Sequence, residues 1–466
     1  MSILPAGPTA YDPGDGWDEA FAAPGVPREH YAGVMEALAR TGPRAAAEAT
    51  RAWLRERGVT FGGEDFVVDP VPRLITASEW EEVAAGLRQR VLALDAFLAD
   101  VHGERRAVAA GVVPEQVVAG APYLEEDLRG ARPAGGARVA IAGLDLVRGA
   151  DGRFRVLEDN VRTPSGSVYG LAASQAVEEA LPVRCPHADA ARELGDALRW
   201  VLEAANPGAE GELVLLTDGP SNPAWHEHVR LAELAGLRIA RPPDLRRRGA
   251  RLELRDGGAP VRAVYRRTDE DRLRDEDGTL TDAGELLLEP LLEGTVGLVN
   301  HYGNGLADDK RVYPYVDDLV RFHLGEEPRL PSVPTYDLAD RDTRSDVVEN
   351  IGDVVVKPRD GYGGDGVTVG PTAGRTELRE AREAVQEDPS GWIAQDPVAL
   401  STHPTVVGDR LKPRHVDLRP FAFCDGAEVR VVPGGLTRVA LEEGSMVVNS
   451  SSGGGGKATW VLAGER

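Results

Sequence analysis

Lysine is almost absent from this sequence. Of 53 basic residues, only Lys310, Lys357, Lys412 and Lys457 are lysine, and all the others are arginine. A general preference for arginine explains most of this scarcity. A lysine that persists can still serve where a compact ammonium on a flexible stem suits a phosphate oxygen better than a planar guanidinium. The sequence around Lys310 and Lys357 is the most suggestive of such a role.

Cysteine and long apolar runs are scarce as well. Cys185 and Cys424 are the only cysteines, too few for a disulfide framework or a structural zinc site. No stretch approaches the roughly 18 apolar residues of a transmembrane helix. Residues 1–7 lack the basic and apolar regions of a secretory signal. These absences predict a cytoplasmic protein.

Acidic residues outnumber basic ones, which gives a net charge of −23 at pH 7. This charge disfavours nonspecific binding to nucleic acid or to an anionic membrane, because both partners would be repelled. A local cationic pocket can still bind ATP. We therefore expect small-molecule or peptide substrates and no nucleic-acid or membrane partner. The sequence does not indicate an oligomeric state.

Apolar periodicity predicts a mixed α/β protein. Spacings of three and four predict helices over 32–40 and 79–102, the second capped by Ser78. Alternation predicts strands over 138–148 and 154–160, joined by a turn into a β-hairpin. We expect four regions: a mostly helical part in 1–130, the hairpin and helices in 131–210, a small α/β subdomain in 211–305, and core strands with a glycine-rich loop in 306–466.

The predicted subdomain alternates strands and helices. Strands are predicted at 213–217, 238–240 and 261–265, with a helix at 224–235. This order indicates a small doubly wound α/β unit. Further strands are predicted in the last third of the chain, at 354–357, 392–395, 416–423 and 428–432.

The predicted hairpin carries an acidic cluster. Asp145 lies on one strand, whereas Glu158 and Asn160 lie two residues apart on the other and would point to one face. Carboxylate and carboxamide oxygens are hard ligands that suit Mg²⁺. The alternative is an acidic hairpin that is simply solvated.

A glycine-rich loop follows Lys357, which itself ends a β-rich run. The loop contains Gly361, Gly363, Gly364 and Gly366. Glycine lets backbone N–H groups approach phosphate oxygens. The spacing matches neither the P-loop nor the dinucleotide fingerprint, so an ordinary hairpin turn is the alternative. Lys310 is a weaker candidate for a phosphate contact when taken alone.

A third cluster lies in the run 415–421. Alternation would place His415, Asp417 and Arg419 on one face of a strand. Arg419 would then bind a phosphate and Asp417 would hold it in place. The alternative is a surface strand of salt bridges.

Taken together, these clusters resemble the circularly permuted ATP-grasp proteins related to glutathionylspermidine synthase. The shared motifs cover nearly the whole chain, at 11–12, 57–61, 69–73, 143–148, 157–166, 265–267, 307–310, 356–358, 400–404, 415–421, 432–438 and 449–451. In an ordinary ATP-grasp enzyme the two lysines and the glycine lid precede the acidic site. Here the acidic hairpin comes first, as circular permutation would produce.

The resemblance implies an ATP-grasp fold that uses ATP and Mg²⁺. It assigns Asp145, Glu158 and Asn160 as metal ligands. It assigns the ATP contacts to Lys310, Lys357, Gly361, Gly363, Gly364, Gln395 and Arg419, with Gln395 beside the adenine and Arg419 at a phosphate.

The sequence departs from the synthase at two points. The synthase carries an arginine just ahead of the first metal aspartate, where this chain has Gly143 and Leu144. Arg162, Arg267 and Arg419 are the candidates to replace that catalytic arginine. Arg267, at the end of a predicted strand, is also our candidate to bind the acceptor carboxylate. The amidase half of the synthase is missing.

The expected activity is ATP-dependent ligation of a carboxylate to an amine through an acylphosphate. One alternative is an ATP-binding protein of the same fold without ligase activity. Another is a phosphotransferase that stops at a phosphorylated product. ADP release that needs both a carboxylate and an amine would distinguish the ligase from both alternatives.

Overall fold

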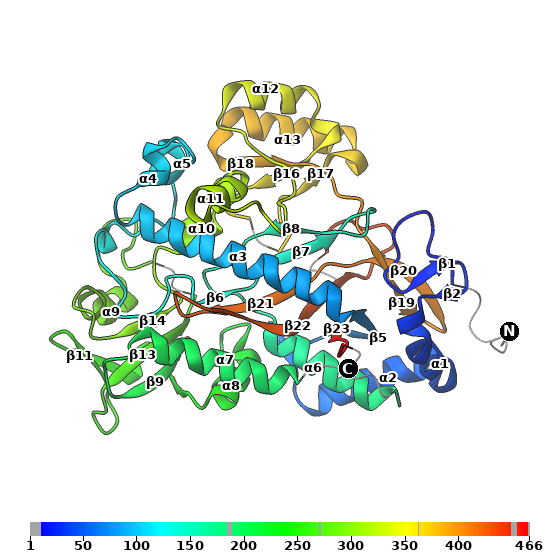
Figure 1. The fold of residues 1–466 in the computed structure, drawn as a ribbon, viewed down its shortest axis with the longest axis horizontal. Coiled ribbons are helices and arrows are strands. Elements are labelled where there is room, and N and C mark those ends of the chain that lie inside the picture. The colour runs from blue at the N-terminus through cyan, green and yellow to red at the C-terminus, as the bar shows by residue number, and fades with distance from the viewer. Residues whose placement is uncertain (1–10, 184–188, 270–271, 362, 449–453, 465–466) are drawn as a thin grey trace.

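The computed structural model describes residues 11–183, 189–269, 272–361, 363–448 and 454–464. These residues form a mixed α/β structure whose larger sheets have four or five strands (Figure 1). The predicted mixed class is confirmed. No helix within the described ranges is long and apolar enough to cross a membrane.

Helices dominate the N-terminal region. The predicted helices are confirmed as α1 (Ala32–Thr41) and α3 (Ala77–Val101), and α2 (Pro43–Glu56) lies between them. The predicted cap of α3 was wrong, because Thr76 caps the helix. The Thr76 hydroxyl accepts a hydrogen bond from the amide of Glu79, whose carboxylate accepts one from the Thr76 amide. Ser78 also has a glutamate three residues on, so the sequence offers two capping boxes and does not distinguish them.

A five-stranded sheet brings a strand from the N-terminal region beside the last strand of the described chain. Its strands, in order, are β5 (Val68–Ile75), β23 (Gly454–Val461), β22 (Val429–Ala440), β21 (Arg419–Cys424) and β6 (Ile141–Ala142). Helix α3 covers one face, and α6 (Ser167–Ala180) and α7 (Ala190–Ala205) cover the other (Figure 1). Alternation along β21 explains the two layers. Ala422 and Cys424 pack in the core with α3, whereas Phe421 and Phe423 pack with α7.

The predicted doubly wound unit is confirmed. Four parallel strands run in the order β10 (Arg238–Ala240), β9 (Glu212–Thr217), β13 (Val261–Arg267) and β14 (Gly297–Val299). Helices α7 and α8 (Trp225–Ala235) pack on the face of Leu213 and Leu215. Helix α9 (Asp282–Leu292) packs on the opposite face, against Val214 and Leu216.

A third sheet stands at the top of Figure 1, apart from the other two. Its strands are β15 (Thr335–Asp337), β18 (Trp392–Gln395), β16 (Val355–Pro358) and β17 (Thr368–Val369). Its small core is shared with α12 (Arg341–Glu349) and α13 (Arg375–Glu387). The strands predicted at 354–357 and 392–395 are thereby confirmed. The predicted boundaries of the four regions stay a prediction.

The predicted hairpin is shorter than expected. β7 (Asp145–Arg148) pairs with β8 (Phe154–Glu158), but Ile141–Ala142 pairs with β21 in the five-stranded sheet. The break falls at Gly143. A Cβ atom at this position would lie 2.8 Å from the Cβ of Pro164 and 3.1 Å from a ring carbon of Phe421. The tight packing explains why glycine stands at this position.

Candidate functional site

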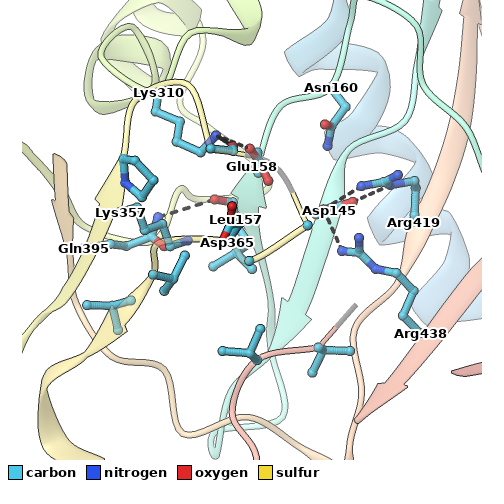
Figure 2. A pocket seen from close by; sticks show the side chains of 18 of the residues that line it. Asp145, Leu157, Glu158, Asn160, Lys310, Lys357, Asp365, Gln395, Arg419 and Arg438 are labelled. Carbon is cyan, nitrogen blue, oxygen red and sulfur yellow. Dashed lines mark hydrogen bonds and ion pairs between the residues drawn. The ribbon is translucent and has the colours of Figure 1, made fainter. Parts of the chain in front are cut away.

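A cavity of about 690 Å³ lies between the hairpin β7–β8, the sheet of β16 and β18, and the strands β21 and β22. Figure 2 shows how side chains from these elements converge on it. The predicted site residues that line it are Asp145, Glu158, Asn160, Arg162, Lys310, Lys357, Gly361, Gly363, Gly364, Gln395 and Arg419. Arg267 is the one predicted site residue that does not.

The acidic cluster is assembled by the hairpin. Asp145 and Glu158 are directly opposite each other in the register of β7 and β8. β8 ends at Glu158, so Asn160 lies beyond the strand and not on its face as predicted. The amide nitrogen Nδ2 of Asn160 is buried and has no hydrogen-bond partner among the described residues.

The two lysines reach the cavity from different elements. Lys310 follows the short helix α10 (Gly305–Asp308), and its Nζ lies 2.9 Å from Oε1 of Glu158 and donates to the carbonyl of Gly361 at 2.6 Å. Lys357 lies on β16 and donates to Oε1 of Gln395 at 2.6 Å. Burial lowers the pKa of Lys357 to about 8, although the negative charges of Glu158 and Asp145 oppose this.

Asp145 is held by two arginines. Arg419 forms a bidentate pair with it, Nε to Oδ1 at 2.6 Å and Nη2 to Oδ2 at 2.9 Å. Nη2 of Arg438, from β22, donates to Oδ2 at 2.6 Å. Burial alone would raise the pKa of Asp145, but the two guanidiniums outweigh it and lower the pKa to about 2. Asp145 is therefore an anion at neutral pH.

The predicted partnership of Asp417 with Arg419 was wrong. β20 (Arg410–His415) ends before Asp417, and β21 begins at Arg419, so the run 415–421 is not one strand. Asp417 is buried and its carboxylate pairs with Arg438 instead. Arg438 also lines the cavity and was missed by sequence reasoning. It lies within the motif 432–438, which carried the family resemblance but no assigned role.

Three glycines of the glycine-rich loop have left-handed backbone conformations. Gly363, Gly364 and Gly366 have φ angles of 64°, 84° and 69°. Other L-residues rarely adopt this left-handed region, so these positions favour glycine for backbone reasons. Gly361, Gly363 and Gly364 line the cavity beside Lys357.

Arg267 has a different place from the one predicted. Its guanidinium donates to the carbonyl oxygens of Thr163 and Pro164 at 3.1 and 2.6 Å and pairs with Glu227 at 3.1 Å. The side chains of Arg267 and Glu227 are only 3% and 0% exposed. Arg267 therefore lies behind the cavity wall, and it supports the segment that lines the cavity without reaching into it.

The cavity offers carboxylate and carboxamide oxygens of the kind that Mg²⁺ takes. Throughout the described ranges, no group of three or more His, Cys, Asp or Glu side chains is placed to hold a metal ion. Asp145 accepts three hydrogen bonds, one at Oδ1 and two at Oδ2, which leaves one lone pair on Oδ1. Glu158 and the carboxamide of Asn160 lie beside it. One or two carboxylates suffice for Mg²⁺, which completes its shell with phosphate and water.

Comparisons with known sequences agree with this arrangement. The family model described as circularly permuted ATP-grasp type 2 matches residues 72–440. A Frankia casuarinae protein named "Putative glutamate--cysteine ligase 2-2" is 44% identical to this chain over 467 residues. These cover 96% of this chain and 54% of the Frankia protein, so the chain spans about half the length of that relative.

Two further relatives carry no functional name. An uncharacterized protein of Mycobacterium leprae is 40% identical over 96% of this chain and 82% of its own length. An uncharacterized protein of Synechocystis is 39% identical over 98% of both chains.

A solved structure shares the fold. The apo form of a glutathione synthetase-like effector from Globodera pallida matches with a TM-score of 0.57. The match covers 90% of this chain and 98% of the effector chain, at 13% identity. At this identity the likeness concerns the fold alone.

Proposed function

Since the chain belongs to the circularly permuted ATP-grasp type 2 family, we propose that it is an ATP-dependent carboxylate–amine ligase. The family and the name of the Frankia relative support an ATP-dependent ligase in general. The order of the cavity residues along the chain is a further support, since the acidic hairpin precedes both lysines as in a permuted ATP-grasp fold.

One observation carries the proposal, namely that a single cavity holds two lysines opposite an acidic hairpin (Figure 2). Lys310 follows α10 and Lys357 lies on β16, whereas Asp145 and Glu158 come from β7 and β8. A polyphosphate between them would meet ammonium groups on one side and ligands for its metal ion on the other.

In the proposed reaction, a carboxylate oxygen of one substrate attacks the γ-phosphorus of ATP. A P–O bond forms as the bond to the ADP oxygen breaks, which yields an acylphosphate and ADP. The amine nitrogen of the second substrate then attacks the acyl carbon, phosphate leaves, and the nitrogen loses one proton to give the amide. The chain supplies position and charge, and no covalent nucleophile of the protein is needed.

The cavity residues divide this work. We assign the ATP phosphates to Lys310, Lys357 and the backbone N–H groups of the glycine-rich loop. Gln395 on β18 accepts a hydrogen bond from Lys357. We assign Gln395 the contact with the adenine of ATP. Asp145, Glu158 and Asn160 would hold Mg²⁺, which when bound neutralises and orients the phosphates.

ADP release tests the proposal. The protein is incubated with ATP, Mg²⁺ and pools of amino acids, polyamines and short peptides, and the products are identified by mass spectrometry. The name of the Frankia relative makes glutamate with cysteine the first pair to test. ADP release that needs both a carboxylate and an amine supports the ligase. ADP release without an amine would indicate a phosphotransferase, and ATP binding without ADP release a binding protein.

A further inference from the structure

Three arginines line the cavity, and they differ in how much of each guanidinium is already engaged. Arg419 uses all three nitrogens, two on Asp145 and Nη1 on the carbonyl of Ser165 at 3.1 Å. Arg162 pairs through Nε with Asp308 at 2.8 Å and lies over the ring of Tyr123 at 4.2 Å. Every nitrogen of Arg419 thus already has a partner, and Asp308 and the ring of Tyr123 hold the Arg162 side chain on the other side.

Arg438 is engaged differently. Its Nε and Nη2 bind Asp417, and Nη2 also binds Asp145. In the part of the chain that the structure describes, its Nη1 makes no hydrogen bond, and the residue lines the cavity. The side chain is 10% exposed. Figure 2 shows Arg438 directed at Asp145, on the opposite side of the cavity from the lysines.

We propose that Arg438 donates a hydrogen bond from Nη1 to the γ-phosphoryl group of ATP, and that Asp417 is the positioning residue that aims it. This inference rests on the proposed function, in which a carboxylate attacks that phosphoryl group. Arg438 would be the guanidinium that stands in for the arginine missing just ahead of Asp145. It only donates hydrogen bonds and takes part in no bond making or breaking.

The surroundings of Arg438 favour this role over a purely structural one. Asp417 is 1% exposed and accepts hydrogen bonds from two nitrogens of the Arg438 guanidinium. The orientation of the guanidinium is therefore fixed before a ligand binds. Donors fixed in advance are the ones that stabilise a charged transition state best. Strand β22, which carries Arg438, lies between β21 and β23 inside the five-stranded sheet and gives a rigid base. A lysine would have to reach Asp417, Asp145 and a phosphate from a single nitrogen, whereas the guanidinium presents donors on three nitrogens in a fixed plane.

The affinities for two nucleotides test the proposal without any acceptor substrate. Mg²⁺ with ADP, and Mg²⁺ with the non-hydrolysable ATP analogue AMP-PNP, are titrated into the wild type, Arg438→Lys, Asp417→Asn and Arg430→Lys. We expect Arg438→Lys to weaken AMP-PNP binding by roughly tenfold, as for one lost charged hydrogen bond, and ADP binding by less than about twofold. Asp417→Asn should weaken AMP-PNP selectively too, by less. Arg430→Lys is the control, since Arg430 is exposed on the same strand and pairs with Glu428.

Folding is checked by thermal unfolding of each variant. If Arg438→Lys unfolds early, Arg438→Ala with added guanidinium chloride at millimolar concentration replaces it, and recovery of AMP-PNP affinity supports the proposal. Equal weakening of ADP and AMP-PNP binding, or no change in either affinity, would overturn the role proposed for Arg438. The proposed ligase function would still stand. A wild type that binds neither nucleotide would overturn the proposed function itself, and the inference with it.

Discussion

The Nζ of Lys310 lies 2.9 Å from Oε1 of Glu158 and also donates to the carbonyl of Gly361 at 2.6 Å. One ammonium thus joins the acidic hairpin to the glycine-rich loop. If ATP binds as proposed, its phosphates compete for this ammonium. Release of Glu158 would then make its oxygen available to Mg²⁺, and release of Gly361 would let the loop adjust over the phosphates.

We expect Glu158→Ala to abolish turnover and leave the fold intact. The side chain is 31% exposed, so its loss should change the free energy of unfolding by no more than about 1 kcal/mol. ADP release and thermal unfolding measure the two effects. Asp151→Ala is the control, because Asp151 is a more exposed carboxylate at the turn of the same hairpin. Turnover at the wild-type rate in Glu158→Ala would contradict the metal assignment.

Lys357→Arg should not behave as a conservative change. The Nζ of Lys357 donates to Oε1 of Gln395 at 2.6 Å, and Nε2 of Gln395 donates to the hydroxyl of Thr335 at 2.9 Å, so the acceptor of Lys357 is held in place. A broader planar guanidinium should fit poorly there. We expect ATP affinity to fall by roughly tenfold or more, as when one charged hydrogen bond of about 1.5–3 kcal/mol is lost.

Calorimetric titration with ATP measures this loss. Lys412→Arg provides the control, because Lys412 is exposed on β20 and away from the cavity. It should bind ATP like the wild type. Equal ATP affinities for Lys357→Arg and the wild type would show that Lys357 makes no essential phosphate contact.

The affinity for ATP should fall at alkaline pH. Burial lowers the pKa of Lys357 to about 8 in the free protein, so the ammonium loses its charge as the pH rises through this value. Because ATP prefers the charged form, its affinity should decline above pH 8, by at most about tenfold per pH unit. Titrations between about pH 7 and 9.5 test this. Lys357→Arg should flatten the profile, since its guanidinium stays charged; a profile unchanged by the substitution would assign the titration elsewhere.

Locally determined parts of the fold were predictable from the sequence. Helices α1 and α3 and three strands of the parallel sheet, β9, β10 and β13, follow from apolar spacing, which acts over a few residues, whereas β14 was not predicted. The resemblance to the permuted ATP-grasp family is confirmed by the family match over 72–440. The break of the predicted hairpin at Gly143 was not predictable. It follows from close contacts of Gly143 with Pro164 and Phe421, which lie outside the local run of sequence.

The scarcity of lysine was informative in part. Lys310 and Lys357 line the cavity, as proposed for phosphate contacts. Lys457 is fully buried and pairs with Asp69, a role that no local pattern suggested. Lys412 is exposed. One lysine of the four therefore shows no special environment.

Arg438 escaped sequence reasoning for a physical reason. Its partners Asp145 and Asp417 are 293 and 21 residues away in the chain. Neither separation matches the short periods by which sequence reasoning finds helices and strands. The pairs form between separate strands and loops whose alignment depends on the whole sheet. Arg419 was found only through its neighbours in the motif, and its partner was assigned wrongly because the local alternation breaks before β21.

The buried pair of Arg267 and Glu227 gives the last prediction. Arg267→Ala should lower the free energy of unfolding by about 3–5 kcal/mol, because it leaves the fully buried carboxylate of Glu227 without its charged partner. Chemical denaturation measures the loss. Arg241→Ala, which breaks a pair whose side chains are 53% and 47% exposed, is the control and should change stability by less than about 1 kcal/mol.

The same variant separates a structural from a direct substrate role. Arg267 anchors the carbonyls of Thr163 and Pro164, which line the cavity, so its loss should weaken catalysis with ATP and carboxylate alike. A direct contact with the acceptor carboxylate would instead raise only the Michaelis constant for that substrate and leave stability nearly unchanged. Such a result would restore the role predicted from the sequence. It would also require Arg267 to leave Glu227, whose 0% exposure makes an unpaired charge costly.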